Sequence, residues 1–216
     1  MPASPDAKHG PMEFRLPTKY LANPIEPKTN IGKRFEAPPS DWFLGKWTVT
    51  DSTRECWHTA KNVRITFWPK DNKPGEQPKD PKKKIKLSSV TEYDKLDGSG
   101  ASKPVLSVEE PDYVVPAAWK GRGRGLKAIT STTGPWQILG WGTRPLADRK
   151  GSEKWMVVWF PPNLPVNEGI DIYCDRAEGL SRETANEIVY ALRQLYAPPM
   201  IYQIENFMRP VAIDSN

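Results

Sequence analysis

The sequence is poor in the residues that most enzymes use for chemistry. It has only two cysteines, Cys56 and Cys174, and two histidines, His9 and His58. A disulfide framework normally needs more cysteines, so we expect reduced thiols, with a Cys56–Cys174 pair open if the first and last strands are neighbours. No metal-ligand spacing, P-loop or dinucleotide fingerprint occurs. We therefore expect no metal and no cofactor, and a redox or phosphoryl-transfer enzyme is disfavoured.

Long hydrophobic runs are also missing. No stretch approaches the roughly 20 apolar residues of a membrane span, and residues 1–11 lack the apolar core of a signal peptide. The net charge of +5 is mild, with the two signs mixed along most of the chain. Such a surface does not by itself indicate a nucleic-acid partner. We expect a cytoplasmic protein with no membrane span and no nucleic-acid partner.

Proline divides the chain into three parts. Of the 23 prolines, eight fall in residues 1–40, which predicts an extended arm with enough apolar side chains to lie over the domain. Residues 41–197 have the length of one ordinary domain. Residues 198–216 are expected to form a short tail.

Short alternating runs dominate the central part. In residues 62–68 the apolar side chains of Val63, Ile65 and Phe67 alternate with other residues, as in a strand with one buried face. Similar runs separated by turn signals predict eight strands, at 46–51, 62–68, 85–93, 105–109, 126–131, 136–142, 155–160 and 169–175. An eight-stranded up-and-down antiparallel barrel removes exposed sheet edges and encloses space for one small ligand. The predicted fold class is all-β.

One helix is predicted after the last strand. Ser181 is a good N-cap, and Ala185, Ile188 and Leu192 lie on one apolar stripe. Proline at 198 and 199 is expected to end it. We expect this helix to pack outside the barrel.

The chain resembles the lipocalins and the wider calycin superfamily in its Gly45-Lys46-Trp47 motif, followed by strands, an arginine and a capped helix. The resemblance implies that Gly45 and Trp47 form the barrel floor, and that Arg176 packs over the indole in a cation–π contact worth about 0.5–2 kcal/mol. Lys150-Gly151-Ser152-Glu153 stands where the family has Thr-Asp-Tyr, so the chain is an outlying relative. It is also similar to small lipocalin-like proteins of filamentous fungi through residues 119–142 and 169–181.

Aromatic side chains are the richest candidate ligand-binding set, because they form rigid apolar walls. Core packing is the alternative explanation for each of them. Both faces of residues 155–160 are apolar, so alternation does not decide which face lines the cavity. The candidates are Trp57, Trp68, Trp119, Trp136, Trp141, Trp155 and Trp159.

Basic residues give two further candidate sites. Arg122 and Arg124 alternate with glycines, which allow close backbone approach, and are predicted to anchor an acidic head group. A solvated turn is the alternative. A lysine cluster in residues 79–86 supports nucleic-acid binding only as a distant third function, because no aromatics interleave it.

Two functions from different classes remain. The first is binding of a small hydrophobic molecule, acidic or aromatic in character, in the barrel cavity. The alternative is a cofactor-independent isomerase or cyclase in the same cavity, since the resemblance extends to allene oxide cyclase and to fungal cyclising enzymes. The sequence does not decide whether the protein is an enzyme, or its oligomeric state. Candidate catalytic residues are His58, Arg64, Glu92 and Tyr93, with a Cys56–His58 pair conceivable if both lie on one strand.

Overall fold

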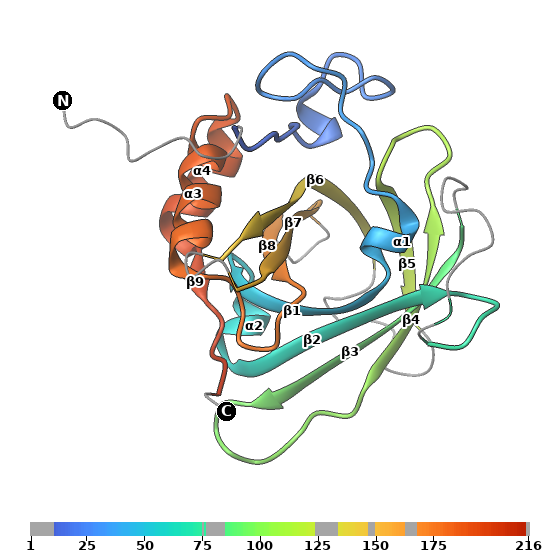
Figure 1. The fold of residues 1–216 in the computed structure, drawn as a ribbon, viewed down its shortest axis with the longest axis vertical. Helices are drawn as coiled ribbons and strands as arrows, with labels where there is room; N and C mark the ends of the chain where they lie inside the picture. Colours follow the sequence, from blue (N-terminus) through green and yellow to red (C-terminus); the bar gives the residue numbers. More distant parts are fainter. Residues whose placement is uncertain are drawn as a thin grey trace.

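A computed structural model describes residues 11–74, 76, 85–123, 134–146, 150–162 and 168–214. Its strands form an antiparallel up-and-down sheet that closes because β1 pairs with both β2 and β8 (Figure 1). A two-residue strand, β9 (Arg209–Pro210), adds to the end of β1. The predicted eight-stranded barrel is confirmed. Its strands are β1 (Gly45–Ser52), β2 (Ala60–Pro69), β3 (Leu87–Lys95), β4 (Val105–Pro111), β5 (Ala118–Gly123), β6 (Pro135–Pro145), β7 (Ser152–Phe160) and β8 (Gly169–Cys174).

Two short helices distinguish the ends of the barrel. Helix α1 (Ser40–Phe43) leads into β1, and helix α2 (Glu55–His58) connects β1 to β2. We call these the α1 end and the α2 end. The longer helices α3 (Arg182–Arg193) and α4 (Pro198–Phe207) pack together outside the barrel, beside β6, β7 and β8 (Figure 1).

The barrel encloses one apolar core and the helices cover another. Val63, Ile65 and Phe67 of β2 belong to the inner core, as their alternation predicts. Strand β7 contributes to both cores, because Met156 and Val158 face the interior while other residues of the strand face the helices. The outward residues of β7 are Trp155, Val157 and Trp159.

Helix α3 begins as its sequence predicts. The Ser181 hydroxyl accepts a hydrogen bond from the Thr184 amide at 3.3 Å, and it donates to the buried Glu153 carboxylate of β7 at 2.6 Å. Ile188 and Leu192 are completely buried against the barrel. The N-cap therefore also fixes the helix to the sheet.

One prediction about local structure needs correction, and another falls outside the described residues. The segment expected to be a tail contains α4, because proline at the first helical position sacrifices no hydrogen bond and its fixed φ suits a helix. The fifth strand is β5, within the glycine-rich segment. The strand predicted at residues 126–131 lies outside the described residues.

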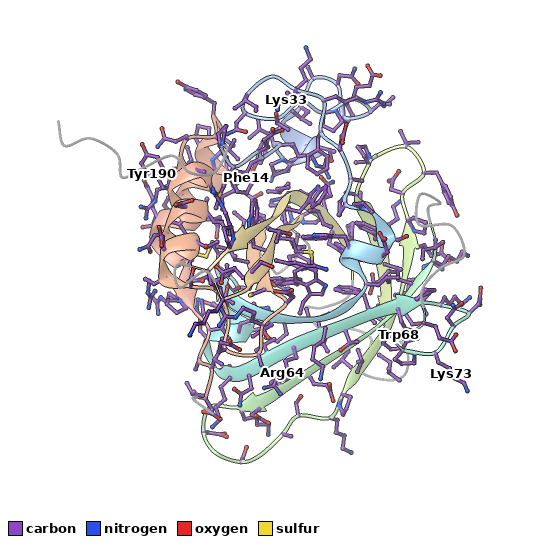
Figure 2. All side chains as sticks on the ribbon, viewed as in Figure 1. Phe14, Lys33, Arg64, Trp68, Lys73 and Tyr190 are labelled. Atoms are coloured by element: carbon purple, nitrogen blue, oxygen red, sulfur yellow. The ribbon has the colours of Figure 1, made fainter. Side chains whose placement is uncertain are left out.

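The N-terminal arm packs tightly onto the barrel. The Phe14 ring is fully buried between the helix layer and β6 (Figure 2). It fits because a Cβ at Gly140 would overlap the ring. The Arg15 amide donates to the Leu139 carbonyl at 2.8 Å, and its guanidinium donates to the Ile138 and Pro116 carbonyls. Burial lowers the pKa of Arg15 to about 9, so the guanidinium remains charged at neutral pH.

Both cysteines are free thiols. Cys174 is buried, and burial raises the pKa of its thiol to about 12, which makes it unreactive. Cys56 lies in α2. No helix in the described part of the chain is long and apolar enough to cross a membrane.

Candidate functional site

A buried polar cluster lies inside the barrel near the α2 end. The Asp171 carboxylate of β8 accepts hydrogen bonds from the Ser52 hydroxyl at 2.6 Å and the Trp57 indole at 3.1 Å. It also forms an ion pair with Arg54 at 3.3 Å and accepts a bond from the Tyr173 hydroxyl at 3.4 Å. Burial lowers the pKa of Arg54, but the charge and hydrogen bond of Asp171, together with the nearby Cys56 and Tyr173, outweigh this and leave the pKa raised. Burial and the same carboxylate raise the pKa of Tyr173 well above its usual value. We call this set the Asp171 cluster.

A second buried carboxyl faces the interior from β4. Glu109 is only 2% exposed, and its carboxyl accepts hydrogen bonds from the Ser89 hydroxyl at 3.0 Å and the Trp136 indole at 2.9 Å. None of the ion pairs between described residues includes Glu109. Burial raises the pKa of this carboxyl, and the Trp136, Ser107 and Ser89 side chains oppose the rise. A carboxylate has about four acceptor positions, so Glu109 retains unused capacity.

The wall around Glu109 reverses the usual alternation. On β4 the polar Ser107 and Glu109 are buried inside, whereas Leu106 is 47% exposed on the outside. On β3 the inner positions include Ser89 and Thr91. A strand with polar residues facing inward and apolar residues facing outward buries less apolar surface, which lowers stability. This orientation favours a binding role for the inner face.

Glycine in β5 makes room for this carboxyl. A Cβ at Gly121 would overlap the Glu109 carboxylate. The glycine-rich segment therefore forms a strand whose missing side chains accommodate Glu109. The basic residue between these glycines, Arg122, is exposed on the outer side, and Arg124 lies outside the described residues. Arg122 is thus not placed to anchor a head group inside the barrel.

The interior cavity is small. About 20 Å³ of space lies among the residues between Glu109 and the Asp171 cluster, with Phe160 and Val158 in the wall. This volume is enough for about one water molecule. Aromatic rings fill the α1 end, where Trp119 stacks on Trp136 at 4.4 Å and Phe43 packs against both.

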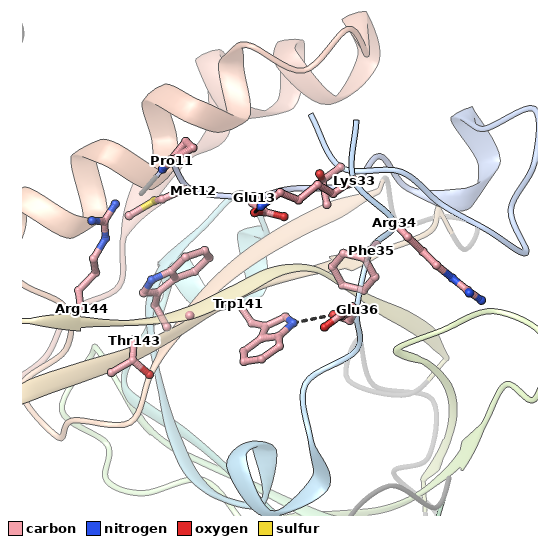
Figure 3. A pocket seen from close by; sticks show the side chains of 13 residues that line it. Pro11, Met12, Glu13, Lys33, Arg34, Phe35, Glu36, Trp141, Thr143 and Arg144 are labelled. Atoms are coloured by element: carbon pink, nitrogen blue, oxygen red, sulfur yellow. Dashed lines mark hydrogen bonds and ion pairs between the residues drawn. The ribbon is translucent and has the colours of Figure 1, made fainter. Parts of the chain in front are cut away.

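A much larger pocket lies outside the barrel, between the arm and β6. Its volume is about 740 Å³. The arm forms one side with residues 11–13, Thr29 and residues 33–36. Trp141 to Arg144 of β6 form the other side, together with Trp155 of β7 (Figure 3). We call this the arm pocket. The Trp141 indole donates to the Glu36 carbonyl at 2.8 Å across it.

The candidate tryptophans separate into four groups. Trp57, Trp119 and Trp136 contribute to the inner core. Trp159 packs under the helices, and its indole donates to Glu168 at 3.0 Å. Trp141 and Trp155 line the arm pocket. Trp68 is partly exposed, on the side of β2 opposite to its buried residues. They do not form one ligand cavity.

The four candidate catalytic residues do not come together either. Arg64 and Glu92 are cross-strand neighbours on the outer face of β2 and β3. A ring nitrogen of His58 lies 3.1 Å from the Ser52 carbonyl, in a helix rather than a strand, which removes the basis for a Cys56–His58 pair. Tyr93 is the one that borders the inner core, where its ring meets Trp57 edge-on at 5.7 Å.

The barrel floor predicted from Gly45, Trp47 and Arg176 lacks the expected arginine contact. Gly45 has a φ of +126°, which lets α1 turn into β1, and the buried Trp47 indole donates to the Phe43 carbonyl at 2.7 Å. Arg176 forms ion pairs with Glu153 and Glu178 instead of stacking on Trp47. The ring that packs on Trp47 is Trp42, at 5.3 Å. This corrects the expected cation–π contact.

Sequence reasoning missed Glu109, Asp171 and Arg54. The only signal for Glu109 was a strand whose polar residues alternate with apolar ones, and that pattern predicts the opposite orientation. In β8 the signal was an aspartate in the middle of an otherwise apolar strand. No group of three or more potential metal ligands occurs in the described ranges.

No protein-family model and no curated protein matches this chain. Among solved structures it is similar to lobster apocrustacyanin A1, with a TM-score of 0.47 and 10% identity over 81% of this chain and 79% of that chain. A likeness at this TM-score and identity carries no argument about this chain. The strand order by itself gives a closed eight-stranded up-and-down barrel with helices outside, which is lipocalin-like in architecture.

Proposed function

We propose that this protein binds a small, mostly hydrophobic molecule in its barrel and recognises a hydrogen-bond donor on that molecule, a hydroxyl or amine, through Glu109. The observation that carries the proposal is the carboxyl of Glu109, a residue that is 2% exposed and that accepts only two hydrogen bonds, both from neutral donors, within the described part of the chain. A buried acid with unused acceptor positions is costly unless a partner arrives.

The ligand class differs from the acidic molecule favoured by the sequence. The buried cation, Arg54, is already paired with Asp171, so a ligand carboxylate would have to displace that partner. A ligand amine or hydroxyl meets an available acceptor at Glu109. The cavity of about 20 Å³ accommodates only this polar group. The apolar body of the ligand requires side chains to move, and half-buried Phe160 at the end of β7 is best placed to do so.

Native mass spectrometry of the purified protein tests the proposal. We expect a bound small molecule on the wild type, loss of that mass in Glu109→Gln, and its retention in Glu92→Gln. Glu92 is the matched control, because it is an exposed carboxyl on the neighbouring strand. A wild type without ligand, or equal occupancy in Glu109→Gln, would contradict the proposal.

An isomerase or cyclase is the second candidate, and one observation favours it. Glu109, whose pKa is raised by burial, shares the cavity with Arg54 and Tyr173. A carboxyl of this kind is suited to proton transfer, and the opposite polar wall suits a developing charge. Chromatography of the released ligand separates the two functions. A carrier returns one compound from the wild type, whereas an isomerase returns two isomers.

A further inference from the structure

The arm pocket has the dimensions of a ligand site, and it is separate from the barrel interior. Its volume of about 740 Å³ falls within the roughly 300–1,000 Å³ typical of small-molecule pockets. Aromatic and apolar side chains contribute much of the wall. They are Met12, Phe35, Trp141 and Trp155.

One buried indole in this wall has no acceptor. Five tryptophans are almost fully buried, and four of them donate their indole N–H to an oxygen. Trp155, at 3% exposure, is the exception among the described residues. Leaving a buried donor unpaired is unfavourable, so this N–H is suited to an acceptor that arrives with a ligand.

The indole nitrogen is buried next to a glycine. A Cβ at Gly142 would lie 3.2 Å from Trp155 Nε1. Gly142 and Trp155 both line the pocket. A larger residue at position 142 would crowd the indole.

A second unpartnered group lies in the same wall. The Thr29 hydroxyl, in a residue 7% exposed, has no hydrogen-bond partner in the described part of the chain. Thr29 is held by the arm's own backbone, through its amide bond to the Lys33 carbonyl at 2.7 Å. The arm thus brings a fixed hydroxyl to a pocket that already contains an available N–H.

One of the three basic residues around the pocket is available to an anion. Lys33 is paired with Glu13 and Arg144 with Glu187, each at 2.9 Å. Arg144 lies toward one side and Arg34 toward the other (Figure 3). Arg34 is highly exposed, and its nearest carboxylate, Glu26, is 3.8 Å away, so this cation is only weakly engaged.

From these observations we infer that the arm pocket binds an aromatic anion: its flat rings lie against the aromatic wall, and a shift of wall side chains lets its acidic group accept hydrogen bonds from Trp155 Nε1 and the Thr29 hydroxyl, which are buried without ligand. This site is independent of the ligand proposed for the barrel. It uses no residue of the Glu109 wall or of the Asp171 cluster.

The test is a fluorescence titration with 8-anilinonaphthalene-1-sulfonate, an aromatic anion, and with N-phenyl-1-naphthylamine, the same ring system without the sulfonate. We expect saturable binding of the anion and at least about tenfold weaker binding of the neutral probe, the scale of one hydrogen bond to a charged group. Equal affinity for the two probes would overturn the assignment of an anion.

Two variants locate the bound probe. Trp155→Phe keeps a ring against Phe14 but removes the N–H, and Thr29→Val keeps the shape of the side chain but removes the hydroxyl. Each should weaken the anion about tenfold. Because neither removes a hydrogen bond made within the protein, circular dichroism and the melting temperature should confirm that both remain folded.

Ser107→Ala is the matched control, since it removes a buried hydroxyl that is also unpartnered but lies in the barrel. It should leave the anion affinity unchanged. Wild-type affinity in both Trp155→Phe and Thr29→Val would overturn the site. Loss of probe affinity only in Ser107→Ala or Glu109→Gln would show that the probe binds in the barrel. The proposal for the barrel is tested separately, by the ligand that co-purifies with the protein.

Discussion

The barrel interior and the arm pocket use their polar groups in opposite ways. In the interior, Asp171 has four side-chain donors around it and lies next to about 20 Å³ of space. In the arm pocket, Trp155 and Thr29 have no hydrogen-bond partner among the described residues and lie next to about 740 Å³. A conspicuous buried charge can thus be structural, whereas the side chains without a partner are those that we propose to bind a ligand. Glu109 is intermediate, because among the described residues its carboxyl accepts two hydrogen bonds and has no ion-pair partner.

The largest effect should come from breaking the Asp171 cluster. Asp171→Ala leaves the Arg54 guanidinium buried without its carboxylate, and we expect the free energy of unfolding to fall by about 3–5 kcal/mol. Urea denaturation followed by near-UV circular dichroism measures this. The double variant Arg54→Met/Asp171→Leu should recover most of the loss. A small loss in the single variant would mean that the cluster is not structural.

Weakening the attachment of the arm to the barrel should have the second-largest effect on stability. Gly140→Ala places a methyl group where the Phe14 ring lies, and overpacking of this kind costs about 1–3 kcal/mol. We expect faster cleavage of the arm in limited proteolysis, with the barrel's circular dichroism unchanged. Phe14→Ala in the same background should cost less than it does alone, because both changes disrupt one contact. Full additivity would contradict this explanation.

The pH dependence of stability should reveal the raised pKa of the buried Glu109 carboxyl. A carboxyl with a raised pKa is protonated in both states below its unfolded pKa of about 4.3. As the pH rises above that value the unfolded state ionises first, so the native state loses stability until the folded pKa is passed. Glu109→Gln should therefore be more stable than wild type at pH 8, by about 1 kcal/mol, with the difference shrinking toward pH 4. Melting temperatures across this range measure it, and a constant difference would contradict a raised pKa.

The smallest effect on stability should come from removing the Thr29 hydroxyl of the arm pocket when no ligand is bound. Thr29→Val removes a hydroxyl that bonds to nothing in the described structure, so its free energy of unfolding should stay within about 0.5 kcal/mol of wild type. Chemical denaturation without any probe provides the measurement. A loss well above 1 kcal/mol would show that the hydroxyl has a structural partner after all, and would weaken the contrast between the two regions.

Much of the barrel was predictable because its strands obey simple alternation. Val63, Ile65 and Phe67 face inward as their spacing predicts. Strand β7 was ambiguous for a physical reason: α3 and α4 cover its outer face, so Trp155 is as buried as Met156. The start of α4 at Pro198 was misjudged, since proline is equally suited to end one helix and to begin the next.

The candidate sites were less predictable than the fold. Glu109 lies on the buried face of β4 against the preference of its neighbours, and only the tertiary register reveals this. The glycines of β5 indicated a turn, although Gly121 provides space for that carboxyl. The arm pocket depends on Thr29 and Trp155, which are more than 120 positions apart in the sequence. Local patterns contain no information on such a pairing.

The guanidinium of Arg15 also has a consequence for the order of folding. It donates to the carbonyls of Pro116 and Ile138, more than a hundred residues later in the chain. The arm leaves the ribosome before the barrel strands, yet its acceptors are synthesised only after β4 and during β6. Contacts of such long sequence separation form slowly. Docking of the arm should therefore be a late event, and the arm pocket comes into existence only once the barrel that it covers is complete.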